Sequence, residues 1–125
     1  MSFDTRLKAQ LPDVIAPDGS EVRILAAASR GSMAHFSLPP GAVSKAVAHR
    51  TVEELWLVLG GRGRMWRKLG AREETVELHP GVSLSIPAGA HFQFRNDGDE
   101  PLHCVGVTMP PWPGMDEAYE VSGPW

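Results

Sequence analysis

Four polar residues in one short stretch, His49, Thr51, Glu53 and Glu54, could bind a metal ion or a polar ligand. Imidazole and carboxylate groups are ligands for transition metals, and both also bind polar molecules. In a regular strand His49, Thr51 and Glu53 share one face, because side chains repeat with a period of two. Glu54 joins that face only through a bulge or a turn. Either glutamate therefore remains a candidate.

A second polar stretch, His91 to Phe94, follows the Pro87-Ala88-Gly89 turn. Strand alternation sends Phe92 and Phe94 to one face, and His91 and Gln93 to the other. If the phenylalanines face the interior, no imidazole from this stretch reaches His49. A shift of one residue would bring His91 or Gln93 inside instead, and the sequence leaves both registers open.

Residues 41–63 and 81–96 resemble the two motifs of the cupin family. The first motif has a glycine, His-x-His, a glutamate and a closing glycine. The second has a glycine, Pro-x-Gly, a histidine and an asparagine. His49 matches the first histidine and Glu54 has the family's spacing to Gly61, whereas Thr51 and Phe92 stand where the other histidines belong.

The resemblance implies a divalent metal such as iron, manganese, nickel or zinc in a complete site. The residues that could hold it here are His49, Glu54, His91 and Gln93. Because two of the four ligand positions are lost, we expect a protein that binds a small polar molecule in the barrel mouth. The alternative is a metal-dependent enzyme of the dioxygenase, isomerase or decarboxylase type, which uses a reduced His/Glu site.

The candidate pocket residues come from both motifs and from one neighbouring strand. Trp56 shares a face with Glu54 by alternation, and an indole can stack on a ligand while its N–H donates a hydrogen bond. The complete set is His49, Thr51, Glu53, Glu54, Trp56, Phe92, Phe94 and His35.

Eight short apolar segments between turn formers must position these side chains. Regularly spaced strands of this length indicate a sandwich or barrel, and the resemblance implies an all-β, double-stranded β-helix (jelly-roll) barrel. We predict one domain over residues 1–125, with the barrel at about 21–110, an N-terminal arm at 1–20 and a C-terminal tail at 111–125. The predicted strands are 21–27, 33–38, 54–59, 64–69, 75–79, 82–86, 91–95 and 102–108.

Composition and charge limit the classes of partner that the chain is expected to bind. The 125 residues carry a net charge of −3, with 12 basic and 15 acidic side chains, so nucleic acid and membrane partners are not expected. The N-terminus lacks a signal-peptide pattern, which favours a soluble cytoplasmic protein. Cys104 is the single cysteine of the chain, so no internal disulfide can form. Residues 54–59 are apolar on both faces, which favours a homodimer.

Overall fold

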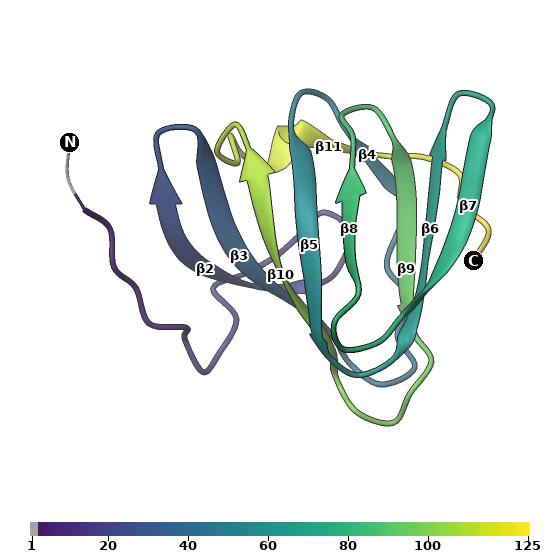
Figure 1. Cartoon of the computed structure of the whole chain (residues 1–125), viewed down its shortest axis with the longest axis horizontal. Coiled ribbons are helices and arrows are strands. Elements are labelled where there is room, and N and C mark those ends of the chain that lie inside the picture. Colours follow the sequence, from purple (N-terminus) through teal and green to yellow (C-terminus); the bar gives the residue numbers. More distant parts are fainter. Residues whose placement is uncertain (1–2) are drawn as a thin grey trace.

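The computed structural model of the chain describes residues 3–125 as an all-β fold made of two antiparallel sheets. The first sheet has the order β1-β2-β3-β10-β5-β8 and the second the order β11-β4-β9-β6-β7. Figure 1 shows the strands of both sheets around a common interior, with the two termini at opposite ends of the molecule. This arrangement confirms the predicted double-stranded β-helix.

All eight predicted strands are present. They are β2 (Glu21–Ala28), β3 (Gly31–Leu38), β5 (Glu53–Gly60), β6 (Gly63–Leu69), β7 (Arg72–Leu78), β8 (Ser83–Ile86), β9 (His91–Asn96) and β10 (Leu102–Met109). Three further short strands complete the sheets: β1 (Val14–Ile15), β4 (Val47–His49) and β11 (Ala118–Glu120). A single turn of 3₁₀-helix, η1 (Met115–Glu117), precedes β11.

Alternation along the strands separates the interior from the outside. In β10 every second residue from Leu102 to Thr108 is buried, and β5 buries Glu54, Trp56 and Val58 while its leucines are exposed. Side chains of successive strand residues point to opposite faces, so each sheet buries one face against the other. The largest fully buried side chains, Phe92 and Phe94, fill the space between the sheets from β9.

A close approach between β6 and β9 depends on Gly63, at the start of β6. A Cβ added there would lie 1.9 Å from the carbonyl oxygen of Arg95. No side chain fits that distance, so the absence of a Cβ at Gly63 lets the two strands pair in register.

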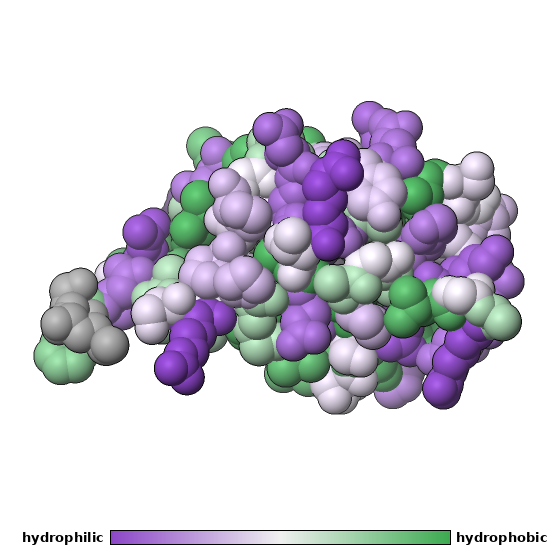
Figure 2. All heavy atoms as spheres, turned by 90° about the horizontal axis from the view of Figure 1, so that it is seen from above, coloured by the Kyte–Doolittle hydropathy of each residue, from purple (hydrophilic) through white to green (hydrophobic). Residues whose placement is uncertain are grey.

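The N-terminal segment lies outside the sheets. Figure 1 shows it passing beside β2, and the view from above in Figure 2 shows it projecting from one side of the body. Within residues 3–125, no helix has the length and apolar character needed to cross a membrane.

Candidate functional site

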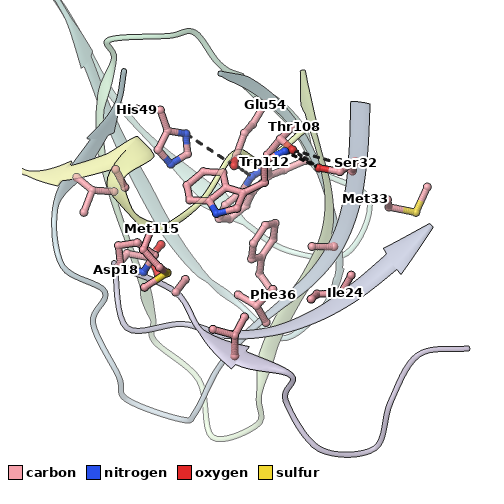
Figure 3. A pocket seen from close by; sticks show the side chains of 18 of the residues that line it. Asp18, Ile24, Ser32, Met33, Phe36, His49, Glu54, Thr108, Trp112 and Met115 are labelled. Carbon is pink, nitrogen blue, oxygen red and sulfur yellow. Dashed lines mark hydrogen bonds and ion pairs between the residues drawn. The ribbon is translucent and has the colours of Figure 1, made fainter. Parts of the chain in front are cut away.

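A cavity of about 250 Å³ lies between the two sheets. Its walls come from β2, β3, β5 and β10 of the first sheet, from β4 and β9 of the second, and from the segments 14–18 and 112–118. Most of the surface is apolar. Figure 3 shows His49 and Glu54 on one side of this space, with Phe36 and Ile24 opposite.

Glu54 is the buried carboxyl of the cavity. Its position in β5 turns the side chain inward, where 4% of the residue is exposed. Glu54 Oε2 accepts a hydrogen bond of 2.6 Å from the indole Nε1 of Trp56, two residues along the same face. Burial raises the pKa of Glu54 from 4.5 to about 7, against the opposing effect of the Trp56 hydrogen bond; the nearby charge of Asp18 adds to the rise. Near neutral pH this carboxyl is therefore poised between its neutral and charged forms.

His49 faces Glu54 from the end of β4. Its Nδ1 is buried, has no hydrogen-bond partner within the described chain and lies 3.8 Å from Glu54 Oε1. Burial lowers the pKa of His49 to about 4, although the charge of Glu117 acts in the opposite direction. The imidazole is thus neutral at pH 7, so it forms no ion pair with Glu54. At 3.8 Å the two polar atoms are also too far apart for a direct hydrogen bond. An oxygen atom to one side of the line that joins the two atoms would lie within hydrogen-bond reach of both.

Aromatic rings form much of the cavity wall. Phe36 and Trp56 stack with their centroids 5.2 Å apart, and Phe92 and Trp112 each meet the ring of His49 edge-on, at 5.2 and 5.1 Å. A Cβ at Gly106 would lie 2.7 Å from the Phe36 ring and 3.0 Å from Trp56, so this glycine lets the two rings stack across β10. These edge-on and stacked contacts stabilise the walls of the cavity.

Smaller polar groups line the rest of the cavity. The hydroxyls of Ser32 and Thr108 are hydrogen-bonded at 2.5 Å, and Ser32 Oγ also accepts the backbone N–H of Trp112 at 2.9 Å. Asp18 is buried and accepts hydrogen bonds from the amide and the hydroxyl of Ser20 at 2.9 and 2.6 Å. Burial raises the pKa of Asp18 despite these bonds. Among the described residues that line the cavity there is no lysine or arginine.

The choice between Glu53 and Glu54 is settled by a turn. Residues 50–52 separate β4 from β5, so the alternation that begins at His49 does not continue into β5. Glu54 consequently faces the cavity, whereas Glu53 is exposed on the outer face.

Thr51 also lies outside the cavity, contrary to the sequence-based assignment. Its backbone N–H and its hydroxyl both donate to the carboxylate of Glu117, and the amide of Val52 donates to the same group. The side chain of Thr51 therefore holds the turn against η1 instead of facing His49.

His91 and Gln93 point away from His49, on the opposite face of β9. His91 is partly exposed, and the Gln93 amide donates to the backbone oxygens of Ser44 and Trp125 at 2.8 and 2.9 Å. The register is the unshifted one, in which Phe92 pairs with Val47 and faces the interior. Neither His91 nor Gln93 can act as a ligand beside His49.

Two further pocket candidates have other surroundings. His35 lies on the outer face of β3, where its Nε2 is 3.0 Å from Nδ1 of His103. Phe94 is buried in the core and meets Trp56 edge-on at 5.0 Å, but it does not line the cavity. Of the eight pocket candidates the cavity thus contains His49, Glu54, Trp56 and Phe92.

The side chains present do not fit a transition-metal site. Within the described chain, no group of three or more His, Cys, Asp or Glu side chains is placed to hold a metal ion. His49 and Glu54 offer two donors, one Glu54 oxygen is already bound by Trp56, and Phe92 occupies the space beside the imidazole. Catalytic sites for these metals use at least three protein ligands.

Several cavity residues escaped the sequence analysis. Phe36, Ser32 and Thr108 could have been found from the alternation of β3 and β10, once a partner strand had fixed which face is buried. Asp18 and Trp112 come from segments outside the predicted barrel, and no local pattern marks them as part of this site.

Comparisons with known proteins agree with this fold. The family model described as "Cupin domain" matches residues 34–108, which include most of the cavity strands. An uncharacterized protein of Methanocaldococcus jannaschii is 29% identical over 107 residues, 82% of each chain.

Solved structures with a similar fold include further proteins with this double-stranded architecture. An uncharacterized conserved protein with a double-stranded beta-helix domain from Klebsiella pneumoniae has a TM-score of 0.69 at 16% identity, covering 95% of this chain and 91% of that one. Bacillus subtilis oxalate decarboxylase, a protein with Mn(II) centres, has a TM-score of 0.73 at 20% identity and covers 90% of this chain. The match spans 30% of the decarboxylase. At these identities the likeness concerns the fold alone.

Proposed function

The chain belongs to the cupin family, and on that premise we propose that it binds a small uncharged molecule in the cavity between its sheets, without a resident metal. The ligand has an apolar body and one hydrogen-bonding group. This proposal narrows the small polar molecule expected from the sequence, because most of the cavity surface is apolar.

The observation that carries the proposal is the unpartnered Nδ1 of His49. A buried polar atom without a hydrogen bond costs about 1 to 3 kcal/mol, so native proteins rarely leave one. This nitrogen borders an apolar cavity and faces a carboxyl oxygen 3.8 Å away. A hydroxyl or carbonyl oxygen of a ligand that forms hydrogen bonds to both groups would give His49 Nδ1 its missing partner.

The charge of the cavity disfavours an anionic ligand. His49 is uncharged at pH 7, and the titratable groups that remain, Glu54 and Asp18, are carboxyls. An anion such as a carboxylate would enter a low-dielectric space without a cation to pair with it, which is costly. The decarboxylase neighbour is therefore no guide to the ligand of this chain.

The size of the cavity favours a ring-sized ligand. A cavity of roughly 150 Å³ lined by apolar side chains accepts benzene. The space here, about 250 Å³, leaves room for a six-membered ring with small substituents. Trp56, Phe92 and Trp112 offer ring edges and faces for such a body.

The test compares ligands that share a ring but differ in one group: benzyl alcohol, toluene and benzoate. Binding is followed by calorimetry and by intrinsic tryptophan fluorescence, to which Trp56 and Trp112 of the cavity wall contribute. We expect benzyl alcohol to bind at least about tenfold more tightly than toluene, since two hydrogen bonds contribute roughly 1.4 kcal/mol or more together. Benzoate should bind more weakly than the alcohol.

Variants assign the effect to the site. His49→Ala should remove the preference for the alcohol over toluene, whereas His79→Ala, at an exposed turn, should leave it unchanged. Metal content is measured on the same samples. Tighter binding of benzoate, or a stoichiometric metal that disappears in His49→Ala, would refute the proposal.

A further inference from the structure

The last segment of the chain, residues 110–125, connects the cavity to the outer face of the second sheet; we call it the strap. Trp112, Met115 and Ala118 line one side of the cavity. From there β11 pairs with β4, and the residues that follow lie against the outer face of β9. Figure 1 shows the strap in yellow, running from the end of β10 toward the side of β6 and β7. One segment therefore contacts both the cavity and the far side of the second sheet.

Gln93, on the outer face of β9, binds the main chain at the end of the strap. Its Oε1 accepts the amide of Trp125 at 3.1 Å, and its Nε2 donates to the Trp125 carbonyl at 2.9 Å and to the Ser44 carbonyl at 2.8 Å. A strand that receives an added peptide binds its main chain with the same pair of bonds. A Cβ at Gly123 would lie 2.6 Å from the Cβ of Ala46, so a glycine is needed for this close approach.

The indole of Trp125 lies against two arginines of the second sheet. The guanidinium carbons of Arg64 and Arg95 are 5.5 and 5.4 Å from the centroid of its ring, within the range of cation–π contacts. Asp97 accepts a hydrogen bond from each arginine, at 3.0 and 2.7 Å, and so fixes their positions. Gln93, Arg64 and Arg95 thus form a clamp that binds both the main chain and the ring of Trp125.

The strap is held by fewer main-chain bonds than the strands that form the rest of the cavity wall. β3, β5 and β10 of the first sheet and β4 and β9 of the second each pair with a neighbour on both sides. By contrast, β11 has three residues and pairs only with β4, at the edge of its sheet. Glu117 holds the preceding η1 to the turn at residues 50–52. Segments with few such bonds open more often than paired strands, so the strap can open without separation of the sheets.

The polar end of the cavity lies behind the strap. Trp112 meets the ring of His49 edge-on at 5.1 Å, and its amide donates to Ser32 Oγ at 2.9 Å. His49 and Glu54 are only 5% and 4% exposed. Figure 3 shows Trp112 beside both of these side chains. A ligand oxygen therefore reaches His49 and Glu54 when the strap moves Trp112 away.

We propose that the strap is the gate of the cavity and that the clamp on the outer face of the second sheet sets how often it opens. The role in ligand exchange rests on the proposed function, whereas the opening of the strap does not. Segments that close over a site commonly control entry and release. The clamp does not touch the ligand, and the open form stays a minor state. Weakening the clamp should therefore speed association and dissociation alike, with little change in affinity.

The first test measures amide hydrogen exchange by NMR on the full chain without ligand. In Trp125→Ala and in Gly123→Ala we expect the amide of Trp112, in the cavity wall, to exchange at least about fivefold faster than in the wild type. Ser122→Ala is the matched control, because this exposed neighbour makes no contact with the clamp, and it should leave the rate unchanged. Circular dichroism checks that each variant keeps the fold. Faster exchange at Val121 with an unchanged rate at Trp112 would overturn the proposal, since the end of the strap would then fray without opening the wall.

The second test measures the exchange of benzyl alcohol between the cavity and solution, from NMR line shapes. Its release should be at least about fivefold faster in Trp125→Ala and in Gly123→Ala than in the wild type or Ser122→Ala, with a dissociation constant that changes less than about twofold. Equal release rates in all four proteins would overturn the role of the strap as a gate. If the wild type does not bind the alcohol, the proposed function fails, and the exchange rate at Trp112 alone decides whether the clamp controls the strap.

Discussion

Replacing Glu54 by glutamine should remove a large part of the pH dependence of stability. Burial holds the pKa of this carboxyl at about 7 in the folded chain, above its ordinary value of 4.5. Between pH 4.5 and about pH 7, Glu54 has lost its proton in the unfolded chain but keeps it in the folded chain. The unfolded state then binds fewer protons, so the free energy of unfolding falls as the pH rises.

The size of this effect follows from the two pKa values. A pKa difference of one corresponds to 1.36 kcal/mol, so the rise from 4.5 to about 7 is equivalent to about 3 kcal/mol. As the pH rises from about 4.5 to about 7, the free energy of unfolding of the wild type should fall by about 3 kcal/mol relative to that of Glu54→Gln. Above about pH 7 the difference between the two proteins should stay constant. Glutamine preserves the shape of the side chain but does not titrate.

Urea unfolding at a series of pH values measures the difference directly. Comparing the two proteins at each pH cancels the contributions of the other titrating groups, Asp18 among them, apart from their interaction with Glu54. Glu53→Gln, one residue away but exposed, is the matched control and should follow the wild type. If wild type and Glu54→Gln keep a constant difference in stability from pH 4.5 to 8, Glu54 does not titrate as a buried acid.

Three further predictions concern packing and hydrogen bonds. Gly63→Ala should destabilise the fold by at least about 3 kcal/mol in thermal unfolding, because its Cβ would overlap the Arg95 carbonyl. The control is Gly70→Ala, which has open space around its Cβ and a φ of 61°, and it should cost about 1 kcal/mol in the same assay. Glu117→Ala should lower stability by about 1 to 3 kcal/mol, because it leaves the amides of Thr51 and Val52 without their carboxylate acceptor. The exposed Glu120→Ala should change it by less than about 1 kcal/mol. Phe92→Ala should cost about 3 to 5 kcal/mol in urea unfolding, and a value below 1 kcal/mol would show that the side chain is not part of the packed core.

The strands could be predicted because their signals are local. Short apolar segments bounded by turn residues mark the eight longer strands, several of them with alternation as well, and each can be recognised without its neighbours. β4 carries no such signal: its three residues, Val47–His49, are all buried, since β9 and β11 flank the strand on both sides. The strand that positions His49 is therefore one of the three short strands, with β1 and β11, that pattern reasoning missed.

The choice between the two glutamates could not be made from the sequence. The alternation argument carried the face of His49 forward to Glu53, but it holds only along an unbroken strand. The chain turns at residues 50–52, and that turn is fixed by Glu117, more than sixty residues away. Which glutamate is buried thus depends on a long-range contact that local spacing does not report.

The two departures from the family motif have different structural consequences. Thr51 faces Glu117 outside the cavity, so a histidine at that position would not point at His49 unless the turn itself changed. Phe92 lies inside, edge-on to His49, and is the position from which a third donor could reach the cavity. Even Phe92→His would join a glutamate whose second oxygen is held by Trp56. The poor fit of this site to a metal ion therefore depends on the β4–β5 turn and on the Glu54–Trp56 hydrogen bond as well as on the two missing histidines.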